Sequence, residues 1–149
     1  MKRGQKYMNY WLFKSEPNSW SWKDQKKAGS RGESWDGVRN HQASNNMKKM
    51  KFGDLGFFYH SVSEKRIVGI VEIIKEYHDD PTDNSNRFGM VRVKAIKTLE
   101  KTVSLEEIKT NEKLSNFIML RQNRLSVLPV SKEEWQIICK MANLKSINL

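Results

Sequence analysis

Cysteine is almost absent from this sequence, in which Cys139 is the single example among 149 residues. One thiol cannot form a disulfide within the chain or supply a thiolate metal cluster. The histidines, His41, His60 and His78, lack the close spacing at which a helix presents two metal ligands. The sequence therefore predicts no metal or other cofactor, and we expect a cytoplasmic protein.

Long apolar runs are also missing. The apolar stretch behind the basic residues of the N-terminus covers only Tyr10 to Phe13, which is too short for a secretion signal. No segment is long enough to cross a bilayer, and no amphipathic basic helix is predicted that would lie on a lipid surface. We therefore expect no membrane partner, and we expect residues 1–8 to form a flexible basic N-terminus.

Acidic residues are in short supply, with 17 Asp and Glu against 27 Lys and Arg, so the formal net charge is +10. This balance points to a polyanionic partner, since charge informs about partners rather than fold. The length predicts one domain with its core between about residues 9 and 143. Five Trp in so short a chain argue against disorder. The oligomeric state stays open, with a monomer favoured.

Sequence signatures of common enzymes are missing too. No strained Gly-x-Ser-x-Gly elbow and no glycine-rich phosphate loop occur. His60 and Ser61 beside Glu16 or Asp36 resemble a hydrolytic constellation in residue type alone, but the same pair suits the end of a strand and its turn. We therefore predict a protein without catalysis and keep a small hydrolase as an alternative.

The strand signals are short and widely spaced. Tyr10 to Lys14 is an aromatic-rich run that ends before Pro17 and predicts a first, central strand. Two runs joined by a polar link predict a hairpin, and an alternating run follows a polar loop that spans residues 79–86. The hairpin strands are Leu55–His60 and Arg66–Glu76, the alternating strand is Met90–Ile96, and the last strand is Leu125–Val130.

Helices are predicted between these strands by their caps and by apolar spacing. Ser21 with Asp24 starts a short helix over residues 22–28, and the pairs Ser104 with Glu107 and Ser131 with Glu134 start two more. In a further helix Ala43, Met47 and Met50 share one face, while Asn40, Ser44 and Lys48 lie on another. Strands with helices inserted between them indicate an α+β domain with a curved or closed sheet.

Candidate binding residues gather in the first third of the chain. Trp11, Trp20, Trp22 and Trp35 lie among Lys14, Arg39 and Lys48, and aromatic with basic residues suit base stacking and phosphate contact. The alternative for each Trp is core packing, and we expect about half of them to be buried. Asn40, Gln42, Asn45 and Asn46 carry the donors and acceptors that read a base edge. For Asn45 and Asn46 a structural role is the better interpretation.

Four ordered motifs resemble the EVE domain family. They are Tyr10-Trp11-Leu12-Phe13-Lys14-Ser15-Glu16-Pro17, Trp35-Asp36-Gly37-Val38-Arg39-Asn40, Tyr59-His60-Ser61 and Arg124-Leu125-Ser126-Val127-Leu128-Pro129-Val130. The resemblance implies a PUA-like fold, a small β-barrel with peripheral helices, related to YTH and ASCH domains. It also implies binding of nucleic acid with modified bases, for which modified cytosine in DNA is the usual suggestion. RNA binding, to transfer or ribosomal RNA, is the main alternative.

On this interpretation a base is turned out of its strand into a pocket. Trp20, Trp35 and Tyr59 are the predicted aromatic walls, and Ser15, Asn40 and Ser61 meet the polar base edge. Phosphate contact or support of the pocket is predicted for Lys14, Arg39, Lys48, His60 and Arg124. Arg39 has an alternative role, pairing with a carboxylate to lock its loop. His41 and Ser44 replace a Tyr and an Arg common in the family, and Phe88 stands near a common Trp.

Overall fold

The computed structural model describes residues 8–144, so most of the predicted flexible N-terminus lies outside the described residues. Six strands form one mixed sheet in the order β2-β5-β4-β3-β1-β6. Their bounds are β1 Tyr10–Ser15, β2 Glu33–Ser34, β3 Leu55–His60, β4 Arg66–Asp79, β5 Gly89–Ser104 and β6 Val127–Val130. The predicted α+β class is confirmed.

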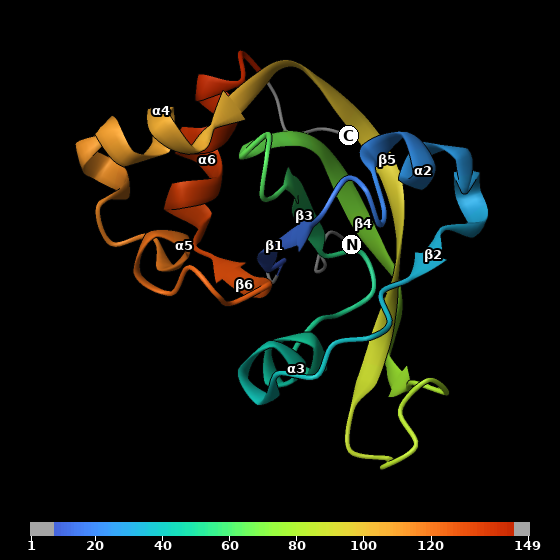
Figure 1. The fold of residues 1–149 in the computed structure, drawn as a ribbon. Coiled ribbons are helices and arrows are strands. Elements are labelled where there is room, and N and C mark those ends of the chain that lie inside the picture. Colours follow the sequence, from blue (N-terminus) through green and yellow to red (C-terminus); the bar gives the residue numbers. More distant parts are fainter. Residues whose placement is uncertain (1–7, 145–149) are drawn as a thin grey trace.

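The centre of the sheet is built from β1, β3 and β4. All six residues of β3 are buried, and β1 runs parallel to β3 while β4 runs antiparallel to it. The predicted hairpin and the interior place of the first strand are thus confirmed. In Figure 1 the long ribbons of β4 and β5 extend well beyond the shorter strands. β5 is longer than the predicted run because residues 97–104 continue to pair with the start of β4.

Within the described residues, five α-helices and two 3-10 turns flank this sheet. The helices are α2 Trp22–Lys27, α3 His41–Lys48, α4 Leu105–Thr110, α5 Ile118–Arg121 and α6 Lys132–Met141. The 3-10 turns are η1 Gly29–Arg31 and η2 Glu112–Leu114. The predicted caps are present, since Ser21, Ser104 and Ser131 each form a capping box with the acid three residues on. The short segments η1, η2 and α5 were not predicted.

The core lies on both faces of the sheet. On one face Trp135 of α6 stacks on Phe57, with ring centroids 3.9 Å apart, and on Tyr10 at 4.5 Å. On the other face Trp22 of α2 packs edge-on to Phe58 at 5.1 Å. Trp11 and Trp22 are buried while Trp20 and Trp35 are half-buried, so the expectation that about half of the four are buried is confirmed.

Helix α3 lies beside one end of the sheet and contacts β6 as well as β4 and β5 (Figure 1). Buried Asn46 donates from Nδ2 to the backbone oxygen of Val127 at 2.8 Å, which confirms its structural role and satisfies part of the β6 edge. Ser44, predicted on a different helix face from Ala43 and Met47, is also buried, and its hydroxyl lies 2.9 Å from that of Tyr77 in β4. The strands form a row that ends at β2 and β6, so closure into a barrel stays a prediction.

Within residues 8–144, no helix combines the length and the apolar character that crossing a membrane would require.

Candidate nucleic-acid site

Two hollows adjoin the end of β1, where successive strand residues face opposite sides of the sheet. Lys14 pairs in register with Tyr59 of β3, and Ser15 pairs with His60. Lys14 and Glu16 line both hollows, so the two adjoin each other. We call them the aromatic hollow and the basic hollow, after the side chains that distinguish them.

The aromatic hollow has a volume of about 340 Å³, near the small end of the range for ligand pockets. Its wall combines two indoles with hydroxyl and carboxylate groups. The lining residues are Lys14, Ser15, Glu16, Ser19, Trp20, Glu33, Ser34, Trp35 and Asp36. Three of the predicted pocket residues, Ser15, Trp20 and Trp35, are therefore brought together here.

Trp20 is held in place by a chain of hydrogen bonds that reaches the sheet. Its Nε1 donates to Oε1 of Gln25 at 2.8 Å, and the fully buried Gln25 donates onward to the backbone oxygen of Val93 at 3.1 Å. The hydroxyl of Ser15 donates to the backbone oxygen of Trp20. Because the ring is fixed before any ligand arrives, binding against it costs little ordering entropy.

Trp35 is fixed from the opposite side. Its backbone nitrogen donates to the backbone oxygen of Val91 at 2.8 Å, which continues the pairing of β2 with β5. Its ring stands edge-on to Phe13 at 5.0 Å and to Phe58 at 5.7 Å. Since Phe13 and Phe58 are fully buried, the sheet's core supports the half-buried Trp35 ring.

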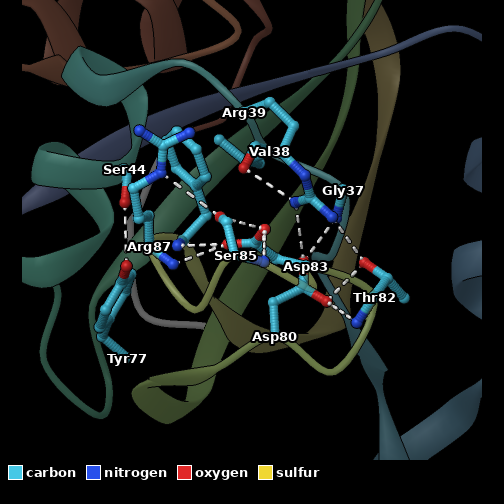
Figure 2. A network of polar contacts seen from close by, with 11 residues as sticks. Gly37, Val38, Arg39, Ser44, Tyr77, Asp80, Thr82, Asp83, Ser85 and Arg87 are labelled. Atoms are coloured by element: carbon cyan, nitrogen blue, oxygen red, sulfur yellow. Dashed lines mark hydrogen bonds and ion pairs between the residues drawn. The ribbon is translucent and has the colours of Figure 1, made fainter.

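A network of polar contacts fixes the segment that follows Trp35 (Figure 2). The backbone nitrogen of Gly37 donates to Asp80 at 2.8 Å, where φ at Gly37 is +77°, a backbone conformation that favours glycine. Arg39 pairs with the same carboxylate and donates to the Thr82 hydroxyl at 2.9 Å. The carboxylate pairing that was predicted as the alternative role of Arg39 is thus present. Contact of Arg39 with phosphate stays a prediction.

A second carboxylate organises the loop between β4 and β5. Asp83 accepts hydrogen bonds from the backbone nitrogens of Ser85 and Arg87 (Figure 2). The backbone nitrogen of Phe88 donates to the same carboxylate. The Ser85 hydroxyl at 2.6 Å is the main cause that holds the pKa of the Asp83 carboxyl well below its usual range. The loop predicted over residues 79–86 is confirmed and is internally braced.

The basic hollow, about 710 Å³ in volume, is lined by four of the other predicted residues. Tyr59, Ser61 and Arg124 line it together with Lys14, so Tyr59 does not face the same hollow as the two indoles. Burial raises the pKa of Tyr59 to about 12, which keeps its hydroxyl neutral. Lys14 donates from Nζ to the backbone oxygen of Asn123 at 3.0 Å, and burial lowers the pKa of its ammonium group.

Four predicted residues lie outside both hollows, and Arg39, described above, is one of them. His60 is buried, with Nε2 accepting from the backbone nitrogen of Trp22 at 2.9 Å and Nδ1 facing Glu64 at 2.7 Å. Asn40 caps α3, because its side chain accepts from the backbone nitrogen of Ala43 at 2.8 Å. Lys48 lies over the ring of Tyr77 at 5.6 Å.

The positions at which the sequence departs from the family that it resembles also lie away from the aromatic hollow. The His41 ring lies 4.8 Å from that of Phe88, and Ser44 contacts Tyr77. Sequence reasoning missed the carboxylates Glu16, Glu33 and Asp36 as lining groups of the aromatic hollow, and Lys65 and Lys109 as lining groups of the basic hollow. Glu16 and Asp36 each lie within one of the four motifs, and they were considered only as partners of His60 in a hydrolytic constellation.

Comparisons with known proteins agree with this architecture. The family model described as "EVE domain" matches residues 9–141. Thymocyte nuclear protein 1 of Mus musculus is 34% identical over 170 residues, which cover 93% of this chain and 75% of that protein. The crystal structure of Atu2648 from Agrobacterium tumefaciens is 47% identical with a TM-score of 0.89, covering 91% of this chain and 94% of that one.

Two further structures include nucleic acid. Human THYN1 in complex with DNA that contains 5-methylcytosine is 29% identical, with a TM-score of 0.85 and coverage of 93% of this chain and 99% of that one. The YTH domain of Mmi1 in complex with RNA has a TM-score of 0.53 at 12% identity and covers 91% of this chain and 78% of that one, a likeness of fold alone. The family match spans nearly all of the described residues, and this chain is a member of the EVE domain family.

Proposed function

We propose that this protein binds nucleic acid that carries a modified base, holds that base in the aromatic hollow and catalyses no reaction. Modified cytosine in DNA is the leading ligand. The observation that carries the proposal is the fixed pair of indoles, Trp20 and Trp35, in the wall of one hollow of about 340 Å³. The complex of human THYN1 with 5-methylcytosine DNA supports it, since this chain matches that structure over most of its length.

Turning a base out of its stack costs a few kcal/mol. Contact with aromatic side chains returns about 1 to 3 kcal/mol per base, so two fixed indoles can offset the cost. Because neither ring must be ordered on binding, little of this gain is lost.

The carboxylates of the aromatic hollow favour a base with an exocyclic amine. Glu16, Glu33 and Asp36 are acceptors, and the amine of cytosine is a donor that Glu and Asp accept from. A base with a carbonyl oxygen in place of that amine would set one hydrogen-bond acceptor against another, the carboxylate. The hollow thus suits cytosine better than thymine or uracil.

The added methyl group of a modified cytosine contributes modestly. One buried methyl or methylene group is worth about 0.8 kcal/mol, which corresponds to about a fourfold change in affinity. We therefore expect preference for the modified base rather than exclusion of the unmodified one.

Binding of duplex DNA with cytosine or 5-methylcytosine at one position, measured by fluorescence anisotropy at a stated salt concentration, tests the proposal. The modified duplex should bind about fourfold more tightly. Equal affinities would contradict the proposal. An RNA of matched sequence that binds more tightly than either would favour the RNA-binding alternative, since only an RNA reader needs the 2′-hydroxyl.

The hydrolase alternative is tested by incubating the protein with modified nucleosides and measuring products by mass spectrometry. We expect no turnover, because both ring nitrogens of His60 have partners within the fold, Trp22 and Glu64. A product that appears with the wild-type protein and is absent with His60→Ala would overturn this part of the proposal.

A further inference from the structure

The two hollows at the end of β1 carry opposite charge. The aromatic hollow sets the carboxylates Glu16, Glu33 and Asp36 against the single ammonium group of Lys14. The basic hollow reverses this ratio, with one carboxylate, Glu16, and four cations, Lys14, Lys65, Lys109 and Arg124. Phosphate would therefore be repelled from the first and attracted into the second.

The cations of the basic hollow come from separate parts of the fold. Lys65 ends the turn between β3 and β4, Lys109 lies in the last turn of α4, and Arg124 precedes β6. All three are exposed, and within residues 8–144 none of them forms an ion pair. Their charge is thus available to a ligand.

Lys14 is the shared wall of the two hollows and the most buried of these cations. Burial lowers the pKa of its ammonium group because the charged form loses hydration there. An anion in the basic hollow would compensate that loss.

An apolar side chain stands at the rim of the basic hollow. Val62 is 63% exposed, and its φ of +71° is a conformation that β-branched residues rarely adopt. The backbone nitrogen of Ser63 donates to the oxygen of Ser61 at 3.0 Å, which closes a γ-turn of the strained type around Val62.

This turn is held from both sides by the rest of the fold. Ser61 donates from its backbone nitrogen to the oxygen of Ser15 at 2.9 Å, and Leu105 donates to the oxygen of Lys65 at 2.9 Å. Strained backbone persists where its surroundings fix it, and such positions cluster at functional sites. The fold thus holds an exposed apolar group beside the cations.

We propose that the basic hollow is a second nucleotide subsite, in which Lys14, Lys65, Lys109 and Arg124 contact the phosphates next to the held base and Val62 packs against the neighbouring base. The inference rests on the proposed function, because the strand must continue from the aromatic hollow past Lys14. A nucleic-acid strand is the occupant that the arrangement fits, since it supplies phosphates and an apolar base face together.

The phosphate contacts are tested by the salt dependence of binding to duplex DNA with and without 5-methylcytosine. The double variant Lys65→Gln with Lys109→Gln should lower the slope of log affinity against log salt by about 2 for both duplexes. The matched control, Lys26→Gln with Lys27→Gln, removes two exposed charges of α2 that line neither hollow. An equal fall in slope for the two variants would overturn the subsite.

The role of Val62 is tested by Val62→Gly, which removes the apolar group and relieves the backbone strain. We expect a higher midpoint of thermal unfolding together with an affinity that is about threefold to tenfold lower for both duplexes. Phe52→Ala is the control, since Phe52 is 68% exposed and lines neither hollow. It should leave affinity unchanged.

The outcomes separate the inference from the proposed function. If the wild-type protein binds both duplexes equally but the Lys65 and Lys109 variant loses salt dependence, the preference for a modified base fails and the phosphate subsite stands. If the modified duplex is preferred while Val62→Gly and the Lys65 and Lys109 variant both bind like wild type, the subsite alone is overturned. Failure of the wild-type protein to bind either duplex at low salt overturns both.

Discussion

Nη1 of Arg39 lies 3.2 Å from a carboxylate oxygen of Asp80, and the two partners differ sharply in burial. The Arg39 side chain is 39% exposed, whereas that of Asp80 is fully buried. Asp80 also accepts hydrogen bonds from the backbone nitrogens of Gly37 and Thr82, both at 2.8 Å. This carboxylate therefore joins the loop between β4 and β5 to the segment that follows Trp35.

We expect unequal costs when either partner is removed. Asp80→Ala leaves donors without an acceptor and should lower the free energy of unfolding by about 1 to 3 kcal/mol. Arg39→Gln removes only a partly exposed ion pair and should cost about 0 to 1 kcal/mol. Urea denaturation of both variants measures the difference. Equal losses would show that the ion pair, rather than the buried acceptor, holds the segment.

The second carboxylate of this loop predicts sensitivity to acid. The Ser85 hydroxyl and then three backbone nitrogens hold the pKa of Asp83 below its ordinary value of about 3.9. A depressed pKa contributes stability that is present above the unfolded value and is lost as pH falls through the folded value. Asp83→Asn should thus flatten the fall in unfolding free energy below about pH 4. An unchanged pH profile would contradict this role.

The packing of Trp22 predicts that a single added methyl group will destabilise the protein. A Cβ atom built on Gly69 would lie 2.3 Å from the Trp22 ring, whose Nε1 also donates to Thr98 at 3.0 Å. Overpacking of this kind costs about 1 to 3 kcal/mol. We expect Gly69→Ala to lower the midpoint of urea unfolding, while Gly69→Ala combined with Trp22→Phe recovers part of the loss. No loss in the single variant would mean that Trp22 is not fixed in the core.

Local sequence signals predicted those elements whose pattern is carried by their own residues. Capping boxes at Ser21, Ser104 and Ser131 marked three helix starts, because the cap is a local arrangement of side chain and backbone. The two-residue strand β2 and the second half of β5 have no comparable pattern. Leu99 and Val103 are buried there four residues apart, and the strand exists through its pairing with β4.

The division of the site into two hollows follows only in part from local sequence pattern. Grouping Trp35 with Tyr59 ignored strand alternation. Tyr59 pairs in register with Lys14, whereas Phe13, which the Trp35 ring contacts, is the adjacent residue of β1 and faces the opposite side. Glu33 reaches the aromatic hollow through the pairing of β2 with β5, which depends on residues far apart in the chain. Asn40 caps α3 with its side chain, and its contact with a base stays a prediction.

Trp35 carries the central claim, and its replacement by leucine offers the most direct test. Trp35→Leu keeps an apolar group against Phe13 and Phe58 but removes the ring face available to a base. The measurement is the ratio of affinities for 5-methylcytosine and unmodified duplex DNA at one salt concentration, with circular dichroism to verify the fold. We predict a ratio of about four for the wild-type protein and about one for the folded variant. An unchanged ratio in the folded variant would contradict recognition of the base in the aromatic hollow.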